Sequence, residues 1–153
     1  MRRTTLATLT ALILLLGLAV TPVSAATGVF RLTLTGEQEA TPTCAPPDLC
    51  GDPDAIGASI LIVNPVRDTV CFLARWTGID GTVVAAHIHE APEGEPGGVV
   101  VPLFAGTFDG SDMTRGCVSA NGFADDILAD PADYYINIHS TVYQPGAIRA
   151  QLG

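Results

Sequence analysis

The sequence contains no lysine. Its seven arginines are outnumbered by sixteen acidic residues, which gives a formal net charge of −9 over 153 residues. Two of these arginines, Arg2 and Arg3, stand at the extreme N-terminus, and the rest of the chain carries 5 − 16 = −11. Proteins that bind nucleic acids or anionic membranes neutralise phosphates with clusters of basic residues. The sequence has no such cluster, so it argues against both classes of partner, whereas an acidic surface is compatible with cationic ligands.

Only one long apolar run is present, Leu6–Val20. A pair of arginines precedes this run, and a proline and small residues follow it, which is typical of a secretory signal peptide cleaved near Ala25. The run is short for a membrane-spanning helix. We therefore expect residues 1–25 to be a signal peptide for the general secretory route, and residues 26–153 to form one secreted domain with no membrane span.

The Cys-x-x-Cys spacing that is common in zinc sites is absent, although the chain has four cysteines. Four cysteines allow three pairings, and an exported chain favours disulfides over free thiols. Cys44 and Cys50 bracket a short proline-rich loop, while Cys71 and Cys117 lie in strand-like segments far apart in the sequence. We predict the disulfides Cys44–Cys50 and Cys71–Cys117, with a zinc site on the thiols as the less favoured alternative.

Helical periodicity is also scarce, because most of the chain consists of short segments in which apolar and polar residues alternate. Val29–Thr35 is typical of these segments. Only Phe123–Ala132 lacks the alternation, and Pro131 ends it, which indicates one short helix near residues 123–132. Seven to nine short strands separated by turn residues predict an all-β fold, an antiparallel Greek-key (immunoglobulin-like) sandwich or barrel.

The chain has three histidines, and all of them fall in strand-like segments. His87 and His89 stand two residues apart, so both rings point to the same face of a strand. Opposed side chains on neighbouring strands are roughly 5 Å apart at Cβ, so His139 on a second strand is able to complete a three-nitrogen site. Such a surface-accessible site suits Cu(II) or Zn(II), with Cu(II) favoured. The alternative is that the imidazoles are structural and hydrogen-bond to backbone or carboxylate groups.

Four polar residues are candidates to support the histidines from a second shell. Glu37 and Glu39 are expected to share one face of a strand, although ordinary surface exposure is the competing interpretation. Glu90 follows the histidine pair directly, and Asn137 precedes His139 by two residues. Because neutral imidazole is the form that binds metals, the affinity is expected to weaken as the pH falls below roughly 6.5.

For the strand that carries His139, the alternation of side chains predicts which residues point outward and which point into the core. Tyr135, Asn137 and His139 are expected to share the outer face, and Ile136 and Ile138 are expected to face the core. On this prediction, replacing Ile138 costs far more stability than replacing Asn137.

Four motifs follow one another along the chain, namely Ala86–His89, Val99–Phe104, Tyr134–His139 and Gly146–Leu152. Together they resemble the CHRD domain, the module that is repeated in chordin and found singly in exported bacterial proteins. The opening segment Leu34–Glu39 resembles the start of that module, although Ala40-Thr41-Pro42 follows where the family usually has Val-Pro-Pro. The resemblance covers almost the whole mature chain and implies an immunoglobulin-like β-sandwich, but it supplies no biochemical activity.

These observations leave two main functional hypotheses and one remote one, and no enzyme is expected. The first is a metal-binding module. The second is an extracellular module that binds a protein or a glycan through the loops Glu90–Gly98 and Ala40–Pro53. The remote hypothesis is a superoxide dismutase-like copper enzyme, because the segment His87–Glu90 resembles the strand that holds copper in that enzyme. Three histidines are too few for its bridged copper–zinc pair, and no Gly-x-Ser-x-Gly motif supports a hydrolase.

Overall fold

Eight antiparallel strands form one sheet that curves until its two edges approach each other. The computed structural model describes residues 26–44, 50–108 and 112–153, so the expected signal peptide lies outside the described residues. The strands are β1 (Gly28–Thr35), β2 (Ile56–Asn64), β3 (Thr69–Thr77), β4 (Val83–Glu90), β5 (Gly98–Phe108), β6 (Met113–Ser119), β7 (Tyr134–Ser140) and β8 (Ile148–Gln151). The helical elements are the α-helix α1 (Ala124–Ala129) and the 3₁₀ turns η1 (Gly36–Gln38) and η2 (Pro131–Asp133). Across the sheet, the strand order is β5-β4-β7-β8-β1-β2-β3-β6.

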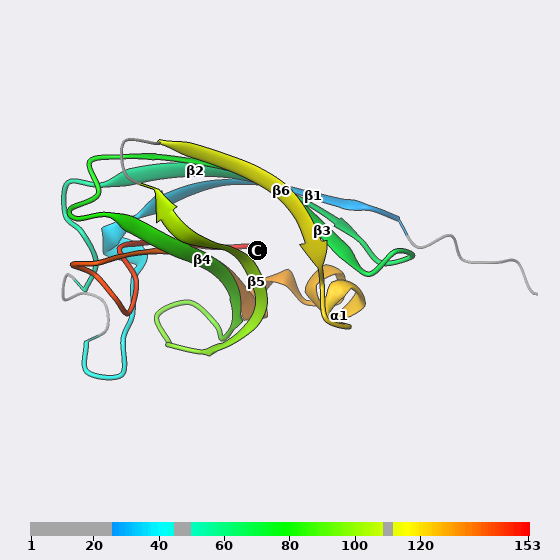
Figure 1. The fold of residues 1–153 in the computed structure, drawn as a ribbon. Coiled ribbons are helices and arrows are strands. Elements are labelled where there is room, and N and C mark those ends of the chain that lie inside the picture. Colours follow the sequence, from blue (N-terminus) through cyan, green and yellow to red (C-terminus); the bar gives the residue numbers. More distant parts are fainter. Residues whose placement is uncertain (1–25, 45–49, 109–111) are drawn as a thin grey trace, which may run out of the picture.

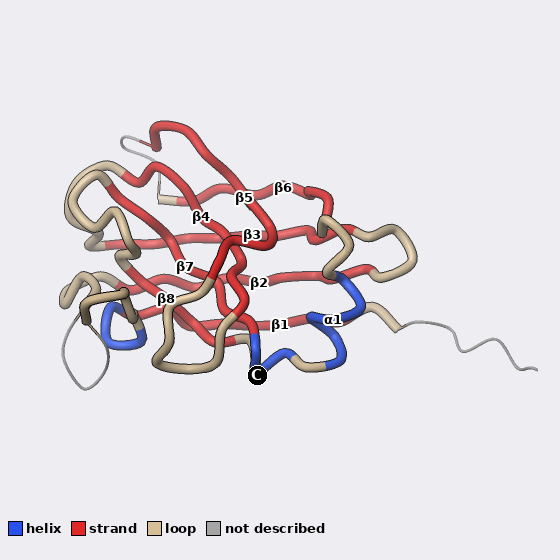
Figure 2. The backbone as a smooth tube through the Cα atoms, turned by 90° about the horizontal axis from the view of Figure 1, so that it is seen from below, coloured by secondary structure: helices blue, strands red, loops and turns tan. Residues whose placement is uncertain are grey.

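This architecture confirms the prediction of an antiparallel barrel or sandwich with one short helix. Figure 1 shows two layers that face each other, with β1, β2, β3 and β6 in one layer and β4 and β5 in the other. Side chains from both layers fill the space between them, including Leu61 and Val70 from the first layer and Ile88 and Ile136 from the second. Figure 2 shows the strands side by side and the loops gathered at their ends.

Strand β2 illustrates how the alternation in the sequence builds the core. Leu61 and Val63 are fully buried, whereas the intervening Ile60 and Ile62 are 37% and 42% exposed. Successive side chains of a strand point to opposite faces, so one face of this layer covers the core and the other is open to solvent.

Strand β7 is the exception, because all seven of its residues are buried. Ile136 and Ile138 belong to the core, as predicted. The opposite face of the strand is covered as well, and Asn137 is only 1% exposed. The expectation that Asn137 tolerates replacement rested on an open outer face, and that premise is wrong.

The single helix lies at one end of the layers (Figure 1). It occupies Ala124–Ala129 within the predicted segment and is followed by the 3₁₀ turn at Pro131. Ile127 is fully buried in the core, and Leu128 lies so close to Gly28 that a Cβ on that glycine would meet it. Among the described residues, none of the helices is both long enough and apolar enough to cross a membrane.

Two disulfides join the cysteines in the pairing expected from the sequence. Cys71 and Cys117 are direct register partners on β3 and β6, so their bridge links two neighbouring strands. Cys44 and Cys50 close a short loop after η1. No cysteine remains free.

Replacing Ile138 with Ala is expected to lower the free energy of unfolding by about 2–5 kcal/mol, because it removes a fully buried side chain and leaves a cavity. Ile62→Ala is the matched control, since it makes the same change in a strand at a partly exposed position, and its expected cost is about 1 kcal/mol or less. Urea unfolding of the oxidised domain measures both values. Equal losses for the two variants would show that the assigned facing of β7 is wrong.

Candidate metal centre

The three histidines lie together on the outer face of β4 and β7, the face turned away from the core. Ala85 pairs with His139 and His89 pairs with Tyr135, so the rings occupy adjacent positions on two hydrogen-bonded strands. One ligand nitrogen of each ring lies within 4.8 Å of those of the other two. The ring centroids of His87 and His139 are 4.8 Å apart, and that of His89 lies 5.6 Å and 5.9 Å from them. The fold therefore brings together the three residues that the sequence singled out.

Backbone carbonyls fix the tautomers of two of the rings. Nδ1 of His139 is 2.9 Å from the carbonyl oxygen of Gln144, and Nδ1 of His89 is 2.9 Å from that of Gly97. A carbonyl only accepts hydrogen bonds, so each Nδ1 carries the hydrogen and each Nε2 of the neutral ring carries a lone pair. Nε2 of His89 is buried and has no hydrogen-bond partner.

The third ring shares a hydrogen bond with the second. Nδ1 of His87 lies 3.0 Å from Nε2 of His139. Because Nε2 of His139 is an acceptor, Nδ1 of His87 carries the hydrogen and donates it. The hydrogen on Nδ1 of His87 therefore lies between the His87 and His139 rings.

Burial keeps all three imidazoles neutral. His89 and His139 are only 7% and 8% exposed, while His87 is partly buried, so access to the predicted site is limited to the side of His87. Burial lowers the pKa of His87 to about 4, with further lowering by His139 and His89. Burial also lowers the pKa of His89 and that of His139. Neutral imidazole is the form that binds metal ions, so the site is ready for a cation at neutral pH.

The cover over the histidines is the loop 91–97, which Arg149 and Gln151 bind from β8. The guanidinium of Arg149 donates to the carbonyl oxygens of Glu95 and Pro92 at 2.8 Å and 2.9 Å. The amide of Gln151 donates to the carbonyl of Ala91 at 2.8 Å. The loop is therefore attached to the sheet through the buried Arg149 and the partly buried Gln151, and it presents the Gly97 carbonyl to the site.

A stack of three side chains holds His89 in place. The ring of Tyr135 lies parallel to that of His89, with a centroid distance of 4.9 Å and an interplanar angle of 12°. The guanidinium carbon of Arg149 lies 3.4 Å from the centroid of Tyr135. The Tyr135 hydroxyl accepts a hydrogen bond from the Gly97 amide at 3.1 Å. Sequence reasoning did not identify Tyr135 or Arg149 as site residues, because only the strand register places them beside the histidines.

Glu39 is a fully buried carboxyl group on the same side of the sheet. Neither of its oxygens makes a hydrogen bond of good geometry, and it packs so tightly on Gly146 that a Cβ there would lie 2.5 Å from the carboxyl group. Burial raises the pKa of Glu39 to about 8, although Arg149 and Asn137 oppose this shift. The interpretation of Glu39 as a surface residue is therefore wrong, and its carboxyl group is mostly protonated at neutral pH.

The other three residues that were expected to support the histidines are Glu37, Glu90 and Asn137, and only one of them lies beside the site. Glu37 and Glu90 are exposed and form no hydrogen bond with a histidine. Glu37 and Glu39 do not share the face of a strand, because the chain turns through η1 between them. Asn137 is the candidate that the fold places beside the site, since its side chain influences the pKa of both Glu39 and His89. Its Oδ1 atom is buried without a partner.

The free energy of unfolding of the wild type is expected to fall as the pH rises from 6.5 to 8, and replacing Glu39 with Gln is expected to abolish this fall. Glu39 ionises near 4.5 in the unfolded chain and near 8 in the fold. Its contribution to stability is therefore complete below pH 4.5 and disappears as the pH rises through 8. The histidines act in the opposite direction below pH 6.5, so unfolding measured between pH 6.5 and 8 isolates the carboxyl group. The wild type should lose stability relative to Glu39→Gln over this range, and the exposed control Glu37→Gln should follow the wild type. Parallel profiles for all three proteins would contradict the assignment.

Comparison with known proteins identifies the family. The CHRD domain family matches residues 30–152, which include every strand that carries a histidine. No curated protein and no solved structure shows significant similarity to the chain. The match covers nearly the whole described structure and agrees with the four motifs in the sequence. The chain therefore belongs to the CHRD domain family.

Proposed function

We propose that the domain is an exported, non-enzymatic binding module for a divalent transition metal, held by His87, His89 and His139. The observation that carries this proposal is the pair of hydrogen bonds from Nδ1 to backbone carbonyls in His89 and His139. Histidines that bind metals are oriented by this kind of outer hydrogen bond, which leaves the other nitrogen as the ligand. Membership of the CHRD family supports a binding role.

His87 completes the site by changing its tautomer. Its Nδ1 hydrogen points at Nε2 of His139 when no cation is bound. For His87 to act as a ligand through Nδ1, its hydrogen would stand on Nε2 instead, which keeps the ring neutral. Binding in this way needs no net release of protons from the three histidines.

Three neutral nitrogen donors without a thiolate favour Cu(II), Zn(II) or Ni(II) over Cu(I). All four cysteines are in disulfides and supply no soft ligand. Cu(II) is favoured among these ions because it stands highest in the general order of affinities for such sites.

A small movement of the rings is needed to close the site. Metal–nitrogen bonds are about 2.0–2.1 Å long, so two ligand nitrogens on one ion are at most about 4.2 Å apart. The widest nitrogen separation in the cluster reaches up to 4.8 Å. Rotation of the imidazoles would shorten these separations, while the hydrogen bonds to the carbonyls of Gly97 and Gln144 limit larger motions.

Export and the absence of catalysis are parts of the same proposal. The two disulfides fit an oxidising, extracellular environment, and the composition of residues 1–25 matches a secretory signal. A dismutase-like pair of bridged metals needs more histidines than the three in the chain. We therefore propose metal binding rather than redox catalysis.

The hypothesis of an interaction module through the loops has less support. Side chains from β8 bind the loop 91–97, and this loop supplies a carbonyl to the histidine cluster. Of the exposed large apolar side chains, Val99 stands just after this loop, whereas three isoleucines lie together on β2, namely Ile56, Ile60 and Ile62.

Calorimetry with Cu(II) and Zn(II), on the domain purified without a histidine tag, tests the proposed site. His89→Phe keeps a ring against Tyr135 but removes the nitrogen donor, and it is expected to weaken Cu(II) binding by at least tenfold. Tyr134→Phe is the matched control, because it changes a ring on the core side of β7 and should leave the affinity unchanged. Electron paramagnetic resonance of the Cu(II) complex should show nitrogen ligands in the wild type.

Two results would contradict the proposed metal site. One is an affinity no better than about 1 mM in the wild type, which corresponds to weak, non-specific binding. The other is Cu(II) binding that survives His89→Phe unchanged in a variant with a wild-type circular dichroism spectrum.

The pH dependence of binding provides a separate prediction. The sequence alone placed the loss of affinity below roughly pH 6.5, but burial lowers the pKa of His87 to about 4. Protons therefore compete with the metal only at more acidic pH. The Cu(II) affinity is expected to stay nearly constant from pH 7.5 to 6 in a buffer that does not bind copper, and to fall between pH 5 and 4. A tenfold loss already at pH 6 would show that the rings titrate as solvent-exposed imidazoles.

A further inference from the structure

The four strands of one layer differ in charge from the rest of the protein. β1, β2, β3 and β6 contain three arginines and no acidic residue. The remaining residues of the chain therefore carry −9 − 3 = −12. The positive charge of this acidic protein is thus concentrated on one layer of the fold.

The register of the sheet places these arginines among apolar side chains on the outer face. Arg31 pairs with Ile60, Ile60 with Leu73, and Leu73 with Arg115, which gives one row across four strands. The next row across the same strands is Thr33, Ala58, Arg75 and Met113.

The outer-face arginines have no partner of their own in the fold. Arg31, Arg75 and Arg115 are exposed, and none of them forms a hydrogen bond or an ion pair with any described residue. Sixteen acidic residues are present in the chain, so the lack of pairing is not due to a shortage of carboxylates. The guanidinium groups remain available to an external anion.

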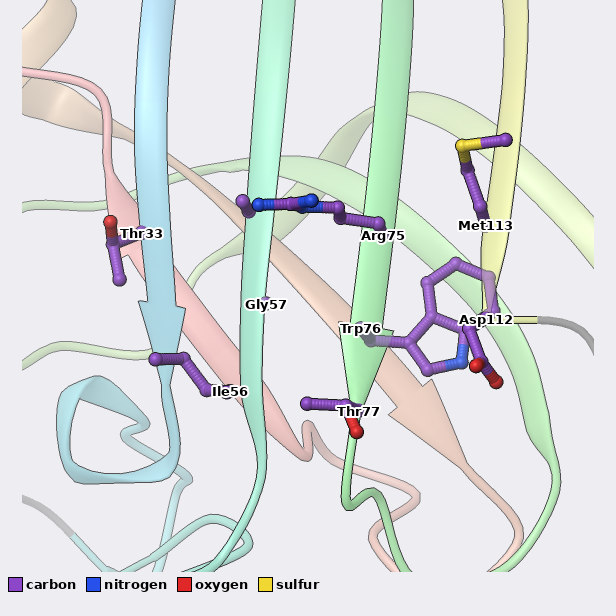
Figure 3. A pocket seen from close by; sticks show the side chains of 9 residues that line it. Thr33, Ile56, Gly57, Arg75, Trp76, Thr77, Asp112 and Met113 are labelled. Carbon is purple, nitrogen blue, oxygen red and sulfur yellow. The ribbon is translucent and has the colours of Figure 1, made fainter.

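A groove of about 480 Å³ lies on this face. Arg75 extends from β3 across β2, between Thr33 on β1 and Met113 on β6 (Figure 3). Ile56, Thr77 and the acidic Asp112 line the end of the groove toward the loops, so an acidic ligand is expected to place its carboxylate at Arg75 and away from Asp112. The residues that line it come from β1, β2, β3 and the start of β6, so a ligand that contacts all of them lies across the strands.

We propose that the outer face of β1, β2, β3 and β6 binds a protein partner through an extended acidic segment, with a carboxylate of that segment against Arg75 in the groove. Arginine and carboxylate groups form bidentate, charge-assisted hydrogen bonds. Apolar side chains of the same segment pack on Ile56, Ile60 and Met113, which are 49%, 37% and 56% exposed.

The composition of the face selects a protein over other anionic partners. Arginine and methionine are enriched at protein–protein interfaces and lysine is depleted there. Trp76 lines the groove but is only 6% exposed, and none of the exposed large hydrophobic residues among the described side chains is aromatic, so little aromatic surface is open for stacking on sugar rings. A symmetric contact between two copies of this face would oppose arginines to arginines, and like charges at an interface are unfavourable.

Nuclear magnetic resonance titration of the ¹⁵N-labelled domain tests the proposal without any metal. The probe is the blocked octapeptide Glu-Glu-Val-Val-Glu-Glu-Val-Val, which in an extended conformation presents alternating acidic and apolar side chains on each face. The expected result is a set of amide shifts confined to β1, β2, β3 and β6, with a dissociation constant below about 1 mM at low salt and weaker binding as salt is added.

Arg75→Glu is expected to weaken binding of this peptide by about tenfold or more, because it reverses the charge in the groove. Arg67→Glu is the matched control, since it makes the same change at an exposed arginine in the turn between β2 and β3 and should retain most of the affinity. Two control peptides complete the design, one with Lys in place of Glu and one with Ser in place of Val, and both should bind at least tenfold more weakly.

Several outcomes would overturn the proposal. They are shifts outside these four strands, no shift at millimolar peptide, equal losses for Arg75→Glu and Arg67→Glu, or equal binding of the lysine peptide. Stronger binding of polygalacturonate than of the acidic peptide would assign the face to a glycan. Concentration-dependent dimers in analytical ultracentrifugation that Arg75→Glu abolishes would assign it to a second copy of the chain.

Discussion

The buried guanidinium of Arg149 is the interaction on which the polar side of this fold depends. It donates hydrogen bonds to two carbonyls of the loop 91–97 and stacks on Tyr135, which in turn stacks on His89. An arginine that is 1% exposed loses its hydration, and these contacts offset that cost. The same contacts fix the loop that supplies the Gly97 carbonyl, so one buried charge determines the orientation of a histidine that it does not touch.

Unsatisfied polar atoms are concentrated on this side of the sheet. Within the described residues, the buried side-chain atoms without a hydrogen bond are both carboxyl oxygens of Glu39, Nε2 of His89 and Oδ1 of Asn137. Buried polar groups in stable proteins are generally paired, so a cluster of exceptions points to a functional site. A neutral Glu39 and three neutral imidazoles reduce the cost of burial, because none of them carries a charge at neutral pH.

The two layers of the barrel use their outer faces in different ways. Loops 91–97 and 141–147 cover β4 and β7, which makes the histidine site secluded and fully buries strand β7. Among residues 26–44, 50–108 and 112–153, no segment covers the outward isoleucines of β2, which remain exposed. The two proposed functions therefore occupy separate surfaces, one enclosed around the histidines and the other open around the exposed arginines.

The sequence by itself determined the strands, the helix near Ile127, both disulfides and the convergence of the histidines, because these follow from local alternation, spacing and pairing across neighbouring strands. It did not determine which outer faces are covered. Glu39 follows a 3₁₀ turn rather than a strand and packs against Gly146, which is far from it in sequence, while Asn137 donates to Pro145 in the loop that follows its own strand. Burial by distant segments and the pairing of Arg149 with Asn137 across β7 and β8 are properties of the tertiary structure. Local periodicity carries no information about them, since it records which face of a strand a residue occupies but not what lies above that face.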